Sequence, residues 1–522
     1  MTLGHELIKE KIVLEQKIGR NTTQVLLEGD IIVPDVKPDM SVILQSDAKV
    51  GIDRFEVSSD RVSFMGRMEI SILYLGRGSA KPVHSMSMVT QIDDFINIDG
   101  VTRDMWVEVA AELTNIDYKM LNDRKISYRA VVDVSVSCER TEEHDIVVNI
   151  GDIPANQLLK TSLAINRRVE NRTDRINVSD SLAIPVGKPN IGVLLQTSVT
   201  LGRQDVRVGS GKVTVNGELV VTNLYSEQNE GRLIEIVENE VPFSGVIEIE
   251  AAREDMIADV TLAVQHVSAQ IAPDNDGEDR IIDIEATLGV VAKVHSVENL
   301  EVLEDAYCIN KELEISKTAI KYPKLICRNK NQCPFKEIVQ LPQEAPPMLS
   351  ILRVSGKPIL DECKVMEDKV VVEGIIMADI LYVAENDDVP LFSHKTILPF
   401  RQLIDTKGSS PGMNIVMDLS NDHVGFNMLS TTEVELRFLL SFGIQVVDER
   451  QCNMITDIAF HDIEPAKLGS MASMVLYVVQ KGDTLWNIAK KYNTSIDSLL
   501  HLNELDAPPK ALEQGQKLLL LR

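Results

Sequence analysis

The fold is decided by the stretch Val62-Ser-Phe-Met-Gly-Arg-Met-Glu-Ile-Ser-Ile-Leu-Tyr74. Apolar side chains occupy nearly every second position on both sides of Gly66, which is the period of a β-strand with one buried face. A glycine inside such a pattern indicates a bend or a bulge. The stretch therefore predicts a half-buried strand that is distorted at Gly66.

The same stretch occurs three times along the chain. Each copy has a Pro-x-x-x-Pro segment, then a glycine 32 residues after the first proline and a tyrosine 40 residues after it. These positions are Pro34, Gly66 and Tyr74, then Pro185, Gly217 and Tyr225, then Pro342, Gly374 and Tyr382. Further alternating segments predict one hairpin per copy, made of 106–113 with 126–136, 256–267 with 280–294 and 413–419 with 433–447. The register indicates an internal repeat.

Each copy is predicted to be a mostly β unit, either a sandwich or a partly open barrel. A short helix is one option for the Pro-x-x-x-Pro segment. A rigid lead into the core strand, with prolines fixing φ, explains this segment better than a ligand site does. The expected domains are 1–150, 151–305 and 306–470, followed by 474–522.

Composition limits the function classes. The 522 residues carry 53 basic and 79 acidic side chains, a net charge of −26, which argues against binding nucleic acid or an anionic membrane through a broad surface. Residues 1–20 are charged throughout and no apolar run reaches membrane length, so neither a signal peptide nor a transmembrane segment is expected. Six dispersed cysteines fit free thiols in a reducing compartment.

The C-terminal residues follow a different pattern. A short β-rich run at 477–479 leads through Gly482-Asp483 to Thr484, which can cap a helix with apolar residues at helical spacing. Thr494-Ser-Ile-Asp497 has the spacing of a capping box for a second helix, and an apolar strand closes the segment at 518–521. The predicted order is β-α-α-β.

This segment resembles a LysM module, through Gly482-Asp-Thr-Leu-Trp486, Asn503 and Gly515-Gln516. In that family, N-acetylglucosamine polymers lie in a groove between the first strand-helix loop and the loop after the second helix. The resemblance thus implies a binding groove formed by Gly482, Asp483, Thr484, Leu485, Asn503, Glu504 and Leu505. The alternative is that Leu485 belongs to the core and that Asp483 and Asn503 are structural caps.

Three acidic β units followed by a LysM module resemble the SPOCS-domain proteins of endospore formers. That resemblance implies a spore coat morphogenetic scaffold in the mother-cell cytoplasm, at the forespore surface. It also implies a partnership with the coat basement-layer ATPase SpoIVA and other coat proteins. The LysM module would then bind a protein partner.

Motifs for catalysis, metals and nucleotides are weak. Gly209-Ser-Gly-Lys212 lacks the spacing of a phosphate loop. Its last two residues, Gly211-Lys212, align with Asp60-Arg61 and Asp368-Lys369 in the repeat, so a turn feeding a strand is expected there. Asp274 to Asp279 is expected to be a hairpin tip and not a calcium loop. The pair Cys327 and Cys333 has no accompanying histidine or second cysteine pair at the spacing of a zinc site. The cluster 142–145 falls near a repeat boundary, where a charged, solvated linker is expected. We expect a non-enzymatic protein with no cofactor and no metal.

Two other classes remain open. One is a cell-wall protein that binds peptidoglycan or N-acetylglucosamine oligomers, and the other is a phage tail-hub component that ends in a LysM module. Neither class predicts a threefold acidic β repeat. Co-purification with a coat ATPase or with glycan would separate them.

Overall fold

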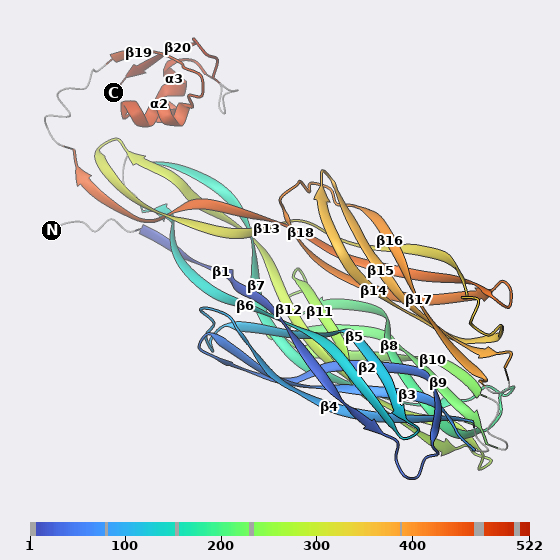
Figure 1. The fold of residues 1–522 in the computed structure, drawn as a ribbon. Coiled ribbons are helices and arrows are strands. Elements are labelled where there is room, and N and C mark those ends of the chain that lie inside the picture. The colour runs from blue at the N-terminus through green and yellow to red at the C-terminus, as the bar shows by residue number, and fades with distance from the viewer. Residues whose placement is uncertain are drawn as a thin grey trace.

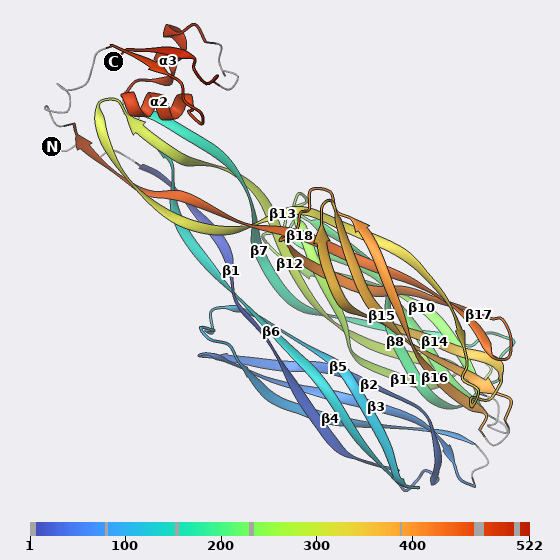
Figure 2. The same cartoon turned by 45° about the horizontal axis from the view of Figure 1, so that its top comes forward.

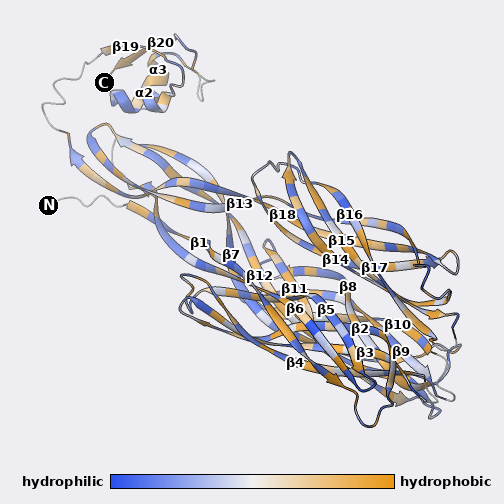
Figure 3. Cartoon of the chain, viewed as in Figure 1, coloured by the Kyte–Doolittle hydropathy of each residue, from blue (hydrophilic) through white to orange (hydrophobic). Residues whose placement is uncertain are grey.

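This computed structural model describes residues 7–78, 82–151, 156–228, 234–386, 389–463, 474–505 and 512–521. The chain is mainly β, with three repeated units followed by a small domain that has two short helices (Figure 1). Hydrophobic and hydrophilic residues alternate along the strands (Figure 3). The predicted fold class is confirmed.

The elements fall into four groups along the chain. Unit 1 contains β1 (Leu7–Ile32), β2 (Met40–Ser58), β3 (Arg61–Gly76), β4 (Val83–Asn97), β5 (Trp106–Asn122) and β6 (Lys125–Ile150). Unit 2 contains β7 (Asn156–Ala183), β8 (Ile191–Gly209), β9 (Lys212–Glu227), β10 (Ile234–Glu248), β11 (Ile257–Pro273) and β12 (Asp279–Cys308). Unit 3 contains β13 (Lys311–Gln340), β14 (Met348–Met366), β15 (Lys369–Ala384), β16 (Leu391–Asp405), β17 (Asn414–Met428) and β18 (Glu433–Asp462). The small domain contains β19 (Met474–Val478), α2 (Leu485–Tyr492), α3 (Ile496–Leu502) and β20 (Lys517–Leu521).

Each unit is a sandwich of two antiparallel sheets. Across the described residues, unit 1 has the sheet orders β1-β6-β5 and β2-β3-β4, and units 2 and 3 repeat these orders strand for strand. The core lies between the two sheets, where Phe64, Ile70 and Tyr74 of β3 belong to one cluster with Ile126 and Val132 of β6. The predicted hairpins are also present, as the pairs β5 with β6, β11 with β12 and β17 with β18. The exact domain limits stay a prediction, because strand grouping does not measure independent folding.

The repeated glycines lie at equivalent places in the central strands β3, β9 and β15. The irregularity lies on the preceding strands β2, β8 and β14. In each of these strands, the pairing register shifts next to the residue that is paired with the glycine. A Cβ at Gly66 would lie 2.4 Å from the carbonyl oxygen of Gly51, and one at Gly374 would lie 2.3 Å from that of Ile359. Glycine therefore lets the bulged strand approach closely, and the strand that carries the glycine is not itself bulged.

The Pro-x-x-x-Pro segment is a turn. Lys37 N donates to the Pro34 carbonyl at 2.9 Å, and Tyr74 Oη donates to the Pro38 carbonyl at 3.2 Å. The tyrosines of the other two copies donate to the equivalent proline carbonyls at 3.1 and 2.8 Å. A short helix at this place is therefore wrong, because the second proline disfavours a helical conformation in the residue before it.

The hairpin turns that precede β3, β9 and β15 also match. Asp60, Gly211 and Asp368 occupy them with φ values of 59°, 73° and 56°. This left-handed conformation favours glycine and is tolerated by aspartate. The prediction that Gly211-Lys212 forms a turn feeding a strand is confirmed.

The three units pack around a common axis, side by side and with their long strands pointing toward the LysM end (Figures 1 and 2). The equivalent residues Leu73, Leu224 and Leu381 are buried in one cluster at one end of the units. Toward the other end, the outer halves of the longest strands form a stem. The core of this stem contains three sets of equivalent residues, with one residue from each unit in every set. The sets are Ile12 with Leu163 and Ile320, Leu14 with Ile165 and Tyr322, and Ile146 with Val302 and Met454. One chain therefore forms a pseudo-threefold assembly.

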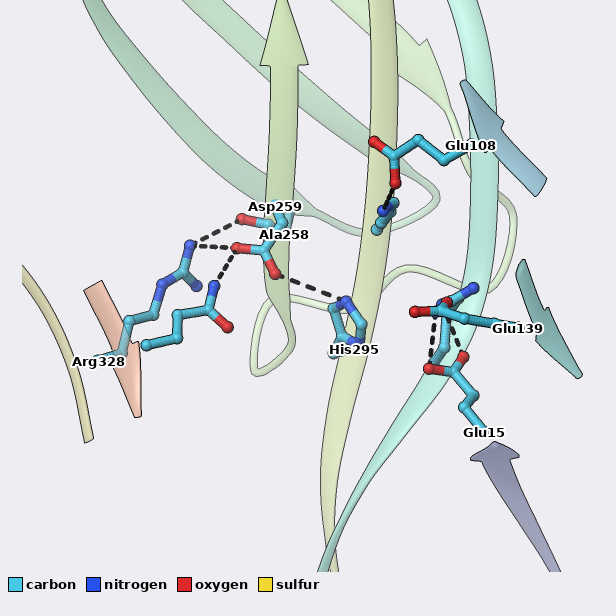
Figure 4. A network of polar contacts seen from close by, with 10 residues as sticks. Glu15, Glu108, Glu139, Ala258, Asp259, His295 and Arg328 are labelled. Atoms are coloured by element: carbon cyan, nitrogen blue, oxygen red, sulfur yellow. Dashed lines mark hydrogen bonds and ion pairs between the residues drawn. The ribbon is translucent and has the colours of Figure 1, made fainter. Parts of the chain in front are cut away.

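Polar contacts join the units along this axis (Figure 4). Between units 1 and 2, Lys293 Nζ lies 2.6 Å from a Glu108 oxygen. Between units 2 and 3, the equivalent residues Gln445 and Asp259 form a hydrogen bond of 2.9 Å, and Arg328 adds an ion pair of 2.6 Å to Asp259. Equivalent positions therefore make a polar contact at both interfaces, as an ion pair between units 1 and 2 and as a hydrogen bond between units 2 and 3.

A second polar contact joins units 1 and 2 deeper in the interface (Figure 4). Arg168, with a side chain only 10% exposed, pairs with Glu15 at 2.6 Å and also with Glu139. Burial raises the pKa of Glu15 to about 7, although the Arg168 guanidinium lowers it. Burial of Glu15 therefore makes this interface sensitive to the protonation of that carboxylate.

Candidate functional site

The predicted groove begins at the loop between β19 and α2. Gly482 has a φ of 92°, which allows the sharp turn after β19. Thr484 is the N-cap of α2, and its side chain accepts a hydrogen bond from Asn487 N, as its place in the sequence predicts. Both residues are exposed, whereas Leu485 is half-buried against the domain core.

Asp483 holds the shape of this loop. Its Oδ2 accepts hydrogen bonds from Tyr477 Oη at 2.7 Å and from Gln480 N at 2.8 Å. The Gln480 backbone bond, followed by the Tyr477 bond, lowers the pKa of the carboxyl group. Asp483 therefore acts on the conformation of the groove loop, which agrees with the alternative of a structural role.

The second wall of the groove follows α3. Asn503 Nδ2 donates to the carbonyls of Leu499 and Leu519 at 2.9 and 2.8 Å, and its Oδ1 accepts from Leu519 N at 2.7 Å. The side chain thus ties the end of α3 to β20. Glu504 is exposed with a φ of 50°, and Leu505 packs on the domain core.

The residues predicted for the groove divide into three groups. Asp483 and Asn503 shape the two loops, and Leu485 and Leu505 support them from the core. Gly482, Thr484 and Glu504 face solvent. Three of the seven predicted residues are therefore exposed to solvent, where a ligand could contact them.

One sequence-based detail of α3 is wrong. The capping-box spacing makes Thr494 the N-cap, but the N-cap is Ser495, which accepts from Ser498 N. Thr494 is buried and its Oγ1 donates to the Leu521 carbonyl at 2.9 Å. The tertiary contact with β20 takes the hydroxyl that the local pattern assigns to the cap.

Sequence reasoning missed the surface on which this domain rests. Trp486 of α2 packs against Tyr307 of unit 2, and its Nε1 donates to Asp305 Oδ2 at 2.9 Å. Neither Asp305 nor Tyr307 belongs to a motif. A signal was present, because Tyr307 has no aromatic counterpart at the equivalent positions of units 1 and 3.

Within the described ranges, no group of three or more His, Cys, Asp or Glu side chains is placed to hold a metal ion. The same residues contain no helix long and apolar enough to cross a membrane. The six cysteines are free.

Comparison with known families agrees with this architecture. The model described as SipL, SPOCS domain matches residues 39–121, 190–272 and 347–429, which span β2 to β5 of unit 1 and the equivalent strands of units 2 and 3. The LysM domain model matches residues 477–520. No curated protein and no solved structure matches the chain significantly. With three SPOCS domains followed by one LysM domain, the chain belongs to the SipL-like SPOCS and LysM proteins.

Proposed function

We propose that this protein is a non-enzymatic scaffold of the spore coat. In this proposal it works in the mother-cell cytoplasm and anchors SpoIVA, the ATPase of the coat basement layer, at the forespore surface. The LysM domain is its partner-binding module. The observation that carries the proposal is the combination of three SPOCS domains in one assembly with a LysM domain whose groove loops face solvent.

The roles of the repeated residues support a scaffold. The glycine of each copy admits a bulged strand, and the tyrosine hydroxyl of each copy is bonded to a proline carbonyl. These glycines and tyrosines stabilise the fold of each unit, so their repetition is explained by structure and does not require a ligand site. The outer surfaces of the units, which these residues do not occupy, are then the places where we expect partners to bind.

The second candidate is binding of peptidoglycan or N-acetylglucosamine oligomers. The LysM family match and the two exposed groove loops favour it. Both candidates use the same loops, so an experiment must compare the two ligands on one set of variants.

The proposed test uses Asp483→Ala in the full chain. This substitution removes both hydrogen bonds that hold the first groove loop. Tyr477→Phe is the matched control, because it removes one of these bonds and leaves the Gln480 bond in place. Retention of purified SpoIVA and of peptidoglycan fragments is measured for both variants, with circular dichroism as the check on folding.

We expect Asp483→Ala to reduce SpoIVA retention much more than Tyr477→Phe does. We also expect SpoIVA to bind more tightly than the glycan fragments. The scaffold proposal fails if folded Asp483→Ala loses glycan and keeps SpoIVA, since the groove would then belong to carbohydrate.

A further inference from the structure

The LysM domain rests on the end of unit 2 where β7 begins and β12 ends. We call the residues 157–159 and 305–309 the unit 2 tip. Several LysM residues form polar contacts with it. Trp486 and Lys490 contact Asp305, Asn493 Nδ2 donates to the Ile309 carbonyl at 2.7 Å, and Ile496 N donates to Gln157 Oε1 at 3.4 Å. The contact face of the LysM domain is therefore α2 with the turn that follows it.

The centre of this contact is aromatic and buried. Tyr307 is 5% exposed and Trp486 is 8% exposed, and their rings meet edge to face with centroids 5.0 Å apart. Tyr307 Oη also donates to the Thr494 carbonyl at 2.8 Å, so its polar end has a partner. Burial raises the pKa of Tyr307, which keeps this hydroxyl protonated. A buried aromatic anchor with a satisfied polar tip is typical of a specific interface.

Asp305 adds charge to the same contact. Its side chain is 18% exposed, and Lys490 Nζ lies 2.7 Å from Oδ2. Burial alone would raise the pKa of Asp305, but the hydrogen bonds from Lys490 and Trp486 outweigh burial and lower it. The carboxylate is therefore charged when the domain is docked.

The pseudo-threefold assembly offers three equivalent tips, and only one of them carries this anchor. The positions equivalent to Asp305 are Asn149 and Asp457, and those equivalent to Tyr307 are Gly151 and Ala459. Asp457 is paired with Lys9 of unit 1 at 3.3 Å. At the positions equivalent to Asp305 and Tyr307, neither of the other units pairs a carboxylate with an aromatic ring, so the LysM domain is matched to unit 2.

We propose that the unit 2 tip is a dedicated seat for the LysM domain, which holds it in one orientation with the groove loops outward. Gly482, Thr484 and Glu504 stay exposed while α2 is covered. A partner that binds the seated domain must therefore recognise the groove loops, because the Trp486 face of α2 is already occupied. The seat does not depend on which ligand the groove binds.

The test uses tryptophan fluorescence in the full chain. The protein has two tryptophans, so Trp106→Phe leaves Trp486 as the single probe. In this background, Lys490→Glu places two carboxylates together at the seat. Lys491→Glu makes the same charge change one residue along, where the Lys491 ammonium lies over the Tyr477 ring of the LysM domain itself. Acrylamide quenching of Trp486 is measured for each variant.

We expect quenching to increase several-fold in Lys490→Glu and to stay unchanged in Lys491→Glu. Asp305→Ala combined with Tyr307→Ala should reproduce the increase from the unit 2 side, whereas Asp457→Ala at the unit 3 tip should not. Circular dichroism of each variant separates undocking from unfolding. Unchanged quenching in both folded seat variants would overturn the proposal, and so would an equal increase in Lys491→Glu.

Discussion

The glycine in the central strand of each unit can be tested with a single methyl group. In Gly66→Ala, the new Cβ would lie 2.4 Å from the Gly51 carbonyl oxygen, a backbone atom of the paired strand β2. The two strands must separate by several tenths of an ångström. Overpacking of this kind costs about 1 to 3 kcal/mol. A loss of that size raises the population of locally open strands by roughly fivefold to more than 100-fold.

Hydrogen exchange of the β2 and β3 amides measures this opening locally, which avoids the need for the whole chain to unfold in one step. Gly51→Ala is the matched control in the neighbouring strand, because a Cβ there has no atom within 4 Å. We expect the control to be neutral, or stabilising by up to about 1 kcal/mol. Gly374→Ala should repeat the loss in unit 3. Equal exchange rates in Gly66→Ala and Gly51→Ala would refute the close-approach explanation.

Three further predictions follow from the contacts between parts of the chain. Leu224→Ala, in the cluster shared by the three units, should lower the free energy of unfolding measured by urea titration by about 2 to 5 kcal/mol. Val193→Ala, at a side chain on β8 that is 40% exposed, should lower this free energy much less. Because burial raises the pKa of Glu15 from 4.5 to about 7, the folded state holds this proton more tightly, so stability should fall as pH rises across that window and Glu15→Gln should flatten the profile. The pKa of Asp305 is lowered, so its contribution to LysM docking is present above its ordinary value of 3.8 and lost as pH falls below it, which quenching of Trp486 should report.

The C-terminal domain was largely predictable because its signals are local. Thr484 caps α2 and Gly482 makes the turn, as the order of residues indicates. The cap of α3 was not predictable in the same way. Thr494 and Ser495 can both accept from a helix N-terminus, and a contact with β20 decides between them.

In the repeated units, too, some features follow from the local sequence and others depend on tertiary contacts. Alternation around Gly66 determines that the stretch is a strand with a buried face, because a period of two places successive side chains on opposite faces. The run Ile72-Leu73-Tyr74-Leu75 breaks the alternation and is buried throughout. Such a run indicates that both faces of the strand are covered, but it does not indicate by what.

Only the tertiary structure decides what covers that second face. Leu73 meets the equivalent leucines of the other two units, so three copies of one pattern close around an axis that no single copy specifies. The seat of the LysM domain is decided in the same way, since Tyr307 and Trp486 lie far apart in the chain and neither carries a local signal for the other. Periodicity, most turns and the cap of α2 depend on residues that are neighbours along the chain, so the order of residues is enough to predict them. Partners for exposed faces depend on shape and charge in three dimensions, and these exist only after the units have folded.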